Sequence, residues 1–260
     1  MIKSVKNPKI QELRSLLRLP KRRREKGSFV VEGARLAEEA LMSNWGVREA
    51  IYTEEAQKAN PDLVRALVAR GHADVVSESV MKATSDTKTP QGILVEVEWK
   101  EMALVSHPSF VLILDGISDP GNLGTLLRSA AAADCDAVLL APDCADAFSP
   151  KVLRSGMGAH FRQPILNLGW PKISAFAKER KLSLYLAESW QGTPYSEVDF
   201  TKPFALIVGS EATGVSEAAE ALKPQTVQIP MPGRMESLNA AIAGSILRFE
   251  AVRQRGVKNQ

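Results

Sequence analysis

Residues 110–130, FVLILDGISDPGNLGTLLRSA, give the clearest indication of the fold class. Its first five residues form an apolar run that is typical of a buried strand, and its second half repeats apolar residues at helical spacing. The Gly-, Asp- and Asn-rich loop between them is typical of a turn from a strand into a helix. We interpret the rest of the chain outward from this strand, loop and helix.

The same alternation continues towards the C-terminus. We predict strands at 110–115, 137–141, 182–187, 205–209 and 226–229. We predict helices near 123–133, 150–157, 171–181 and 237–255. Apolar strands that alternate with helices predict a parallel sheet covered on both faces, so the predicted fold class is α/β.

The N-terminal part also contains both strands and helices and is predicted to form a smaller α/β domain. Strands are predicted at 28–32, 47–52, 73–76 and 91–97, with helices at 7–18, 34–43 and 61–70. Residues 99–109 have little periodicity and are interpreted as a linker. The predicted domains are therefore 1–100 and 108–260.

Three loops are candidates for a ligand site, because ligands bind beyond the carboxyl ends of the strands in parallel sheets. These loops, 115–124, 209–214 and 229–239, concentrate Gly, Asn, Ser and Glu. The first loop lacks both the G-x-G-x-x-G dinucleotide fingerprint and the Gly-Lys-Ser/Thr of a Walker loop. This absence disfavours a Rossmann-type enzyme that uses a nucleotide cofactor on a small molecule.

Four polar residues in or near these loops are candidates for structural or functional roles. Asn122 is predicted to cap the helix after it, which does not exclude contact with a ligand. Arg128 flanks the apolar face of that helix, where it forms a surface ion pair or binds a phosphate with both arms of its guanidinium. Glu211 belongs to a plain turn or binds a hydroxyl or a cation, and Ser237 is the predicted cap of the last helix.

The third loop also offers an apolar slot. Ile229, Met231 and Leu238 could hold a flat ring between them. The helix that follows begins with Ala and Gly residues, which predicts close packing of residues 240–245 against a loop or a second subunit.

Basic charge is concentrated at the N-terminus. Residues 1–28 contain ten Lys or Arg and two Glu, a net charge of +8, whereas the remainder carries −5. Such a segment is predicted to bind a polyanion such as RNA, and the alternative is a solvated tail. The run after Pro20, which is predicted to end the first helix, supplies the candidate contacts Lys21, Arg22, Arg23, Arg24 and Lys26.

Composition excludes several classes of protein. No apolar run approaches the roughly 20 residues of a membrane span, and the basic N-terminus lacks the apolar stretch of a secretory signal. Cys135 and Cys144 are too few for a disulfide framework or a zinc site and are interpreted as free thiols in a reducing cytoplasm. We predict no metal.

The three loops resemble one family when they are taken together. DGISDPGNLGTLLRSA, LIVGSEATGVS and IPMPGRMESLNAAIAGSILRFE resemble the motifs of the SpoU-type (TrmH-like) ribose 2′-O-methyltransferases of the SPOUT class. DAFSPKVLRSGMGAHFRQPI extends the resemblance, and FVVEGARLAEEAL and TPQGILVEVE resemble the family's substrate-binding domain. Mild departures are Ala212, where the family more often has Gly, and Ala133 and Asp134, where many members have an aromatic residue and then Gly.

The resemblance implies a fold, a cofactor and a set of site residues. The C-terminal segment is expected to form a trefoil knot, which periodicity alone would never predict. S-adenosylmethionine is expected to bind at Gly209, Ile229 and Leu238, with Met231 nearby. By motif match, Arg128 is the catalytic arginine. The polar positions around the reacting ribose are Asn122, Glu211, Ser237 and Asn239.

The resemblance also implies the reaction and the partners. The expected reaction is 2′-O-methylation of a structured RNA by a homodimer joined through its catalytic domains. Ribosomal RNA is favoured and transfer RNA is the alternative. A non-catalytic RNA-binding protein with the same fold is the rival from another class. Because the motifs hold no histidine to act as a base, we predict that Arg128 binds the target phosphate and stabilises the developing alkoxide.

Overall fold

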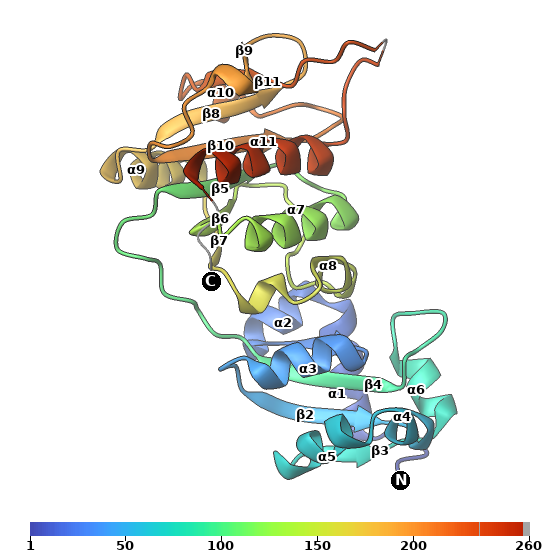
Figure 1. Ribbon diagram of the computed structural model, residues 1–260. Helices are drawn as coiled ribbons and strands as arrows, with labels where there is room; N and C mark the ends of the chain where they lie inside the picture. The colour runs from blue at the N-terminus through green and yellow to red at the C-terminus, as the bar shows by residue number, and fades with distance from the viewer. Residues whose placement is uncertain (234, 257–260) are drawn as a thin grey trace. The chain divides into compact units, whose positions relative to one another are not determined.

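The computed structural model describes residues 1–233 and 235–256, which form two compact units (Figure 1). Unit 1 comprises Met1–Glu101 and Asp146–Phe161, and unit 2 comprises residues 102–145 and the described chain from 162 onward. The division falls inside the predicted linker, as the change in periodicity indicates. It differs from the predicted domains in residues 146–161, which pack with unit 1 although the chain has already entered the larger domain.

Unit 1 is a four-stranded mixed sheet with helices on both faces. Its strands are β1 (Ser28–Glu32), β2 (Val47–Tyr52), β3 (Ala73–Val75) and β4 (Ile93–Glu98). Its helices are α1 (Pro8–Arg18), α2 (Pro20–Lys26), α3 (Ala34–Met42), α4 (Glu54–Ala59), α5 (Pro61–Ala69), α6 (Glu78–Thr84) and α8 (Pro150–Gly156). The strand order is β1-β4-β2-β3, in which only β2 and β3 run parallel.

Alternation along β1 divides the core of unit 1 between the two faces of the sheet. Val30 packs with Leu13 of α1 and Met81 of α6, in a cluster in which every side chain is buried. Phe29 points the other way and contacts Phe148 and Phe161 from the returning segment, with ring centroids 5.0 and 6.2 Å apart. This aromatic contact explains why residues 146–161 belong to unit 1.

The prediction that Pro20 ends the first helix was correct, but the basic run after it is helical and is not a tail. Pro20 occupies the first turn of α2, where a missing N–H costs nothing. The helix ends at Gly27, whose φ of 62° is the left-handed conformation typical of a helix C-terminus. The sequence also missed the short helices α4 and α6, which are capped by the Thr53 and Ser77 hydroxyls.

Unit 2 is a seven-stranded parallel sheet. Its strands are β5 (Phe110–Asp115), β6 (Ala137–Leu140), β7 (Ile165–Asn167), β8 (Ser183–Glu188), β9 (Thr193–Pro194), β10 (Phe204–Gly209) and β11 (Gln225–Gln228). Its α-helices are α7 (Pro120–Ala132), α9 (Trp170–Glu179), α10 (Glu217–Glu220) and α11 (Ala240–Arg255). The order is β7-β6-β5-β10-β8-β11-β9, and every pairing is parallel, as predicted. The predicted α/β fold is confirmed.

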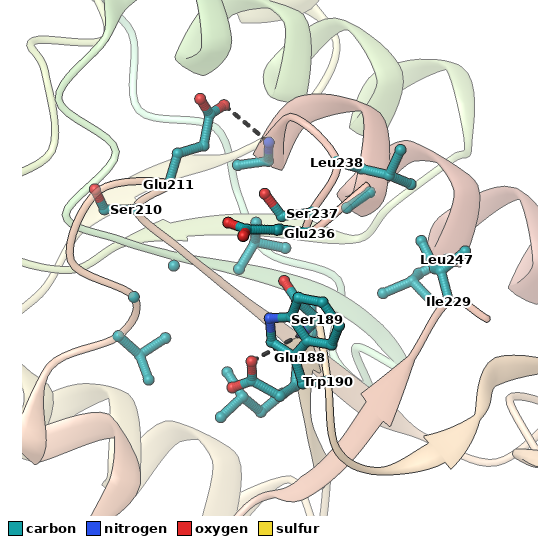
Figure 2. Close-up of a pocket in the computed structure, with 18 of the residues that line it drawn as sticks. Glu188, Ser189, Trp190, Ser210, Glu211, Ile229, Glu236, Ser237, Leu238 and Leu247 are labelled. Atoms are coloured by element: carbon teal, nitrogen blue, oxygen red, sulfur yellow. Dashed lines mark hydrogen bonds between the residues drawn. The ribbon is translucent and has the colours of Figure 1, made fainter. Parts of the chain in front are cut away.

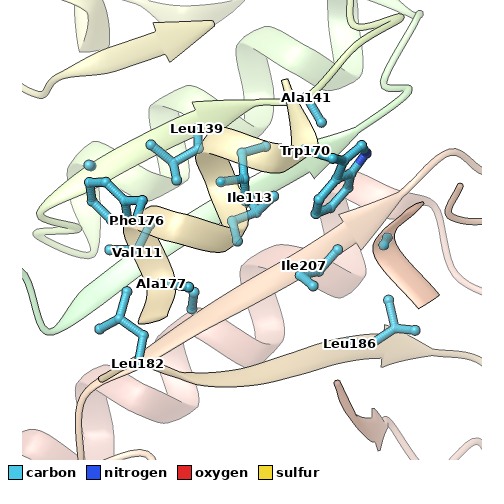
Figure 3. Close-up of a cluster of buried hydrophobic side chains, with 14 residues drawn as sticks. Val111, Ile113, Leu139, Ala141, Trp170, Phe176, Ala177, Leu182, Leu186 and Ile207 are labelled. Carbon is cyan, nitrogen blue, oxygen red and sulfur yellow. The ribbon is translucent and has the colours of Figure 1, made fainter. Parts of the chain in front are cut away.

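Helices cover both faces of this sheet. On one face, Ile113 and Ile207 pack against Ile173 and Phe176 of α9 in a buried cluster (Figure 3). The opposite face carries α7 and α11, which lie side by side (Figure 1). Gly244 of α11 lies so close to this face that an added Cβ would be 3.2 Å from Cγ2 of Val208.

The C-terminal strand β11 lies between two strands that are almost adjacent in sequence. It pairs with β8 on one side and β9 on the other, and only residues 189–192 connect those two. The connection therefore crosses β11. At the crossing, a Cβ on Gly192 would lie 2.6 Å from the Thr226 carbonyl oxygen, so only glycine fits. A strand inserted in this way is compatible with the expected trefoil knot, which stays a prediction.

No helix in the described part of the chain is long and apolar enough to cross a membrane.

Candidate active site

Three side chains from the three predicted motifs meet at the carboxyl ends of neighbouring parallel strands. Gly209 at the end of β10 pairs with Asp115 at the end of β5, so the loops that follow lie together. Oε1 of Glu211 accepts hydrogen bonds from Nδ2 of Asn122 at 2.7 Å and from Nδ2 of Asn239 at 2.5 Å. The Asn239 amide also donates to Oδ1 of Asn122 at 3.0 Å. We call these three residues the polar network.

Helix caps hold the network in place, and two predicted caps were wrong. Asp119, not Asn122, caps α7, because its Oδ1 accepts the Asn122 backbone N–H at 2.8 Å. Asn239, not Ser237, caps α11 through hydrogen bonds from the N–H groups of Ala241 and Ile242. The side chains of Asn122 and Ser237 are thereby free for other roles.

Helix α11 also binds Glu211 directly. The backbone N–H of Ala240, in its first turn, donates to Glu211 Oε1 at 2.9 Å. The positive end of the helix dipole and two side-chain amides thus converge on one carboxylate oxygen. Within the described chain, the second Glu211 oxygen makes no hydrogen bond, and the residue is exposed, so that oxygen can accept a donor from a ligand.

Beside the network lies a cavity of about 340 Å³ (Figure 2). Gly209, Ile229, Met231 and Leu238, the four residues predicted to bind the cofactor, all line it. The remaining lining residues are Leu186, Ala187, Glu188, Ser189, Trp190, Val208, Ser210, Glu211, Gly214, Val215, Glu236, Ser237, Ala240, Ala243 and Leu247. The structure therefore brings the second and third motifs together around one space.

The cavity has an apolar side and a polar side. Figure 2 shows Ile229, Leu238 and Leu247 together on one side, with Glu188, Glu236 and Ser237 on the other. Apolar side chains suit a flat adenine ring, and carboxylates suit a ligand that carries positive charge. These apolar and carboxylate groups fit S-adenosylmethionine, whose sulfonium and amino groups are cationic.

Gly209 is required by close packing at the edge of this cavity. A Cβ there would lie 2.7 Å from the backbone carbonyl of Gly214, which is closer than real Cβ atoms approach. The loop between them closes through paired backbone hydrogen bonds between Ser210 and Gly214 at 2.8 and 2.9 Å. Gly209 itself lines the cavity, so a ligand can approach its backbone without an intervening side chain.

Sequence reasoning missed the contribution of the loop after β8. Glu188, Ser189 and Trp190 line the cavity, and the Ser189 N–H donates to Oε1 of Glu188 at 2.8 Å. The predicted strand at 182–187 ended at the same edge of the sheet as the other site loops. That position could have identified this loop, although its sequence has no glycine-rich pattern before Gly192.

Arg128 does not join the polar network. It lies six residues after Asn122 on α7, which places it about 120° around the helix and about 9 Å along it. Its side chain is exposed, does not line the cavity, and makes no hydrogen bond or ion pair with the described residues. Ser237 lines the cavity and likewise makes no hydrogen bond there.

A buried arginine joins α7 to α11 beside this site. Arg248 is fully buried, donates to the hydroxyls of Ser129 and Ser245, and has no partner for its Nε and Nη1 atoms. Burial lowers the pKa of its guanidinium to about 10. Ser129 directly follows Arg128, so this contact fixes the turn of α7 that carries Arg128.

Some basic residues of α2 are paired with other residues of unit 1, and others are exposed and can contact RNA. Arg23, a predicted RNA contact, is only 3% exposed. Its side chain is not accessible to RNA, so its inclusion among the predicted RNA-binding residues is corrected. Its guanidinium pairs with Asp146 at 2.5 Å and donates to the Leu16 carbonyl, so it joins the returning segment to unit 1. Arg22 and Lys26 both pair with Glu12.

The two remaining basic residues of α2 are the most accessible. Arg24 is exposed and makes no ion pair with the described residues, and the Lys21 side chain is 85% exposed with a 3.8 Å ion pair to Glu25. No group of acidic, histidine and cysteine residues in the described chain could hold a metal ion.

Family models match both units of the chain. Residues 109–249 match the SpoU rRNA Methylase family, and residues 7–95 match the MRM3-like substrate binding domain. The chain is 36% identical to the 23S rRNA (guanosine(2553)-2′-O)-methyltransferase RlmP of Bacillus subtilis, over 95% of this chain and 97% of that protein.

Solved structures agree with this family match. The AdoMet-bound rRNA methyltransferase of Sinorhizobium meliloti superposes with a TM-score of 0.84 at 30% identity, covering 97% of each chain. The SpoU methyltransferase AviRb of Streptomyces viridochromogenes, in complex with AdoMet, has a TM-score of 0.86 at 27% identity and covers 98% of this chain and 100% of that chain. The predicted cofactor class is confirmed by these neighbours.

Proposed function

Because this chain belongs to the SpoU rRNA methylase family, and is an S-adenosylmethionine-dependent methyltransferase, we propose that it methylates a ribose 2′-hydroxyl of ribosomal RNA. The observation that carries the proposal is the polar network of Asn122, Glu211 and Asn239 beside a cavity that fits the cofactor. The RNA class is supported by the names of the relatives, which describe ribosomal RNA substrates.

The cofactor is held by the cavity walls in this proposal. Ile229, Leu238 and Leu247 pack around the adenine, while the backbone of Gly209, which also lines the cavity, approaches it closely. The carboxylates of Glu188 and Glu236 attract the cationic end. When bound there, S-adenosylmethionine supplies a methyl group that is already activated by the sulfonium.

The polar network and Ser237 orient the ribose. The free Glu211 oxygen and the Ser237 hydroxyl can each accept or share a hydrogen bond with ribose hydroxyls. Fixing the 2′-oxygen in line with the methyl group accounts for much of the rate enhancement, because orientation replaces an entropic barrier. The sulfur–carbon bond of the cofactor would break as the oxygen–carbon bond forms. The hydroxyl proton would pass to water, because no histidine lies among the cavity residues to accept it.

Arg128 binds the phosphate of the target nucleotide in this mechanism. Its guanidinium lacks a partner in the described chain, so it can bind two phosphate oxygens at once. A positive charge at that position lowers the energy of the developing alkoxide without accepting a proton, because a guanidinium stays protonated and is a poor base.

Unit 1 captures the RNA and the enzyme acts as a homodimer. The match of residues 7–95 to a substrate binding domain and the exposed bases of α2 support RNA capture. Exposed apolar residues on α11 support a dimer joined through the catalytic domains. The free thiols Cys135 and Cys144 support a location in the reducing cytoplasm.

The test is methyl transfer to separated RNA classes. Purified protein is incubated with radiolabelled S-adenosylmethionine and with ribosomal or transfer RNA from cells that lack the gene. Labelled RNA is then digested and analysed for 2′-O-methylated nucleotides. We expect label at a ribose of ribosomal RNA. Label in transfer RNA alone would overturn the substrate class, and failure to bind the cofactor would favour the non-catalytic RNA-binding protein.

A further inference from the structure

Trp190 is a large aromatic side chain at the cavity that no step of the proposed mechanism uses. It lines the cavity (Figure 2), yet the residue is 65% exposed. An indole left largely in water is unfavourable by the hydrophobic free energy of its exposed surface. The tryptophans of the described cores, Trp45 and Trp170, are 5% and 8% exposed.

The loop that carries Trp190 is fixed at both ends. Glu188, at the end of β8, accepts the N–H of Ser189, and Gly192 rests against the Thr226 carbonyl where the chain crosses β11. The strand β9 begins immediately afterwards and pairs with β11. Trp190 is therefore presented by a short connection between two strands, and its position relative to the cavity is set by the sheet.

The cofactor has an apolar wall of its own. Ile229, Leu238 and Leu247 lie together to the right of Trp190 in Figure 2. An adenine packed there leaves the indole uncovered. The remaining flat group in the reaction is the base of the methylated nucleotide, which is joined to the carbon next to the one that bears the 2′-hydroxyl.

We propose that Trp190 binds the base of the target nucleotide by stacking and so positions its ribose for methyl transfer. This inference rests on the proposed function. Stacking on an aromatic side chain is the general way in which proteins hold an unpaired RNA base, and it tolerates any base because all have a flat face. Trp190 thus contributes binding and orientation, and base identity is read elsewhere.

The experiment compares W190A and W190F with the wild type on an RNA fragment that contains the mapped methylation site. Steady-state kcat and KM for RNA and the Kd for S-adenosylhomocysteine are measured for each protein. For W190A we expect kcat/KM for RNA to fall at least tenfold while the Kd for S-adenosylhomocysteine changes less than twofold. For W190F, which keeps a flat ring, we expect most of the activity. The control V105A alters another exposed apolar residue of unit 2 and should have no effect.

A substrate without the target base isolates the contact. On RNA that carries an abasic ribose at the methylation site, wild type and W190A should have equal kcat/KM, because the stacking partner is gone. A tenfold difference that persists on the abasic RNA would overturn the proposal. An increase in the Kd for S-adenosylhomocysteine equal to the loss in kcat/KM would instead assign Trp190 to the adenine. Absence of methyl transfer by the wild type to any ribosomal RNA would contradict the proposed function.

Discussion

Asn239 shows how one side chain can serve the fold and the site together. Its carbonyl oxygen caps α11, and its amide nitrogen donates to both Asn122 and Glu211. A cap contributes about 1 kcal/mol to helix stability, so loss of this residue would loosen α11 and open the polar network together. Aspartate would keep the cap but place a second carboxylate beside Glu211.

The role of Arg128 is tested by a substitution that keeps the charge. We expect Arg128→Lys to lower kcat by at least about tenfold with saturating RNA, because an ammonium cannot bind two phosphate oxygens in one plane. The control is Arg180→Lys, which should leave kcat unchanged. Arg180 caps the C-terminus of α9 and stacks on Phe176. Near-normal turnover in Arg128→Lys would contradict the phosphate clamp.

His160 makes unit 1 sensitive to acid. It is buried, its Nε2 lies 2.7 Å from the Ala147 carbonyl oxygen to which it donates, and its Nδ1 has no partner. Burial lowers the pKa of this imidazole from 6.5 to about 4. Between these pH values the unfolded chain binds a proton that the folded unit does not, so stability falls as the pH falls, by at most about 1.4 kcal/mol per pH unit.

Urea unfolding at pH 7.0, 5.5 and 4.5 measures this loss. His160→Gln can still donate to the Ala147 carbonyl but does not titrate. We expect the wild type to lose more stability than this variant on acidification, with most of the difference between pH 6.5 and 4. If the difference in unfolding free energy between the wild type and His160→Gln stays constant with pH, His160 is not the titrating group.

At the scale of elements, the contact between α11, α7 and β10 depends on a glycine. A Cβ at Gly244 would lie 2.9 Å from Leu126 Cδ2 and 3.2 Å from Val208 Cγ2. We expect Gly244→Val to displace α11, to destabilise unit 2 by about 1–3 kcal/mol and to weaken S-adenosylhomocysteine binding. Thermal unfolding and calorimetric titration measure the two effects.

The control for this substitution is Gly169→Ala. A Cβ at Gly169 would lie 3.8 Å from Cδ of Pro171, an ordinary contact distance. It should change the melting temperature little and leave cofactor binding unchanged. Normal cofactor binding by Gly244→Val would mean that the α11 contact does not shape the cavity.

The helix α2 carries a prediction about RNA capture. We expect the double substitution Lys21→Gln, Arg24→Gln to weaken RNA binding and to reduce the slope of log affinity against log salt by up to about 2, because two phosphate contacts are lost. Cofactor affinity should not change. Filter binding at several salt concentrations provides the measurement.

Two kinds of control separate binding from folding. Lys58→Gln, Arg65→Gln removes two exposed charges from α4 and α5 and should leave the salt slope unchanged. Arg23→Gln should instead lower the stability of unit 1, because it leaves Asp146 and the Leu16 carbonyl without their donor. Equal loss of RNA affinity in both double variants would mean that α2 is not the docking element.

At the scale of the whole molecule, an apolar stripe on α11 predicts the dimer. Ile242 and Phe249 are 52% and 47% exposed and lie seven residues apart, on one face of the helix. Large apolar side chains exposed in line are typical of a surface that a partner covers. We expect the wild type to be a dimer of the 28.3 kDa chain by light scattering and Ile242→Lys, Phe249→Glu to be monomeric.

The matched control alters an exposed apolar residue of the other unit. Met42 is 79% exposed, and Met42→Lys should leave the mass unchanged. A monomeric wild type, or a double variant that remains dimeric, would contradict this assignment of the interface.

Periodicity and strand ends determined most of the architecture. Strands β5 and β10 are continuous apolar runs, and α11 follows a small-residue pattern, so local burial was evident from the residues themselves. Because the carboxyl ends of parallel strands meet at one edge, the sequence also placed the three loops together. The family resemblance then assigned Asn122, Glu211 and Asn239 to one site. Short elements such as α4 and β9 were missed, since few residues give little periodicity.

Only the tertiary structure decided which residues within these patterns are available. Arg23 is buried because its partner, Asp146, returns from 123 residues away, whereas its neighbour Arg24 is exposed. Trp190 joins the cavity because β11 inserts between β8 and β9, which no local pattern predicts. Apolar periodicity is a property of neighbouring residues, but burial of a charge and the composition of a cavity depend on contacts between distant ones.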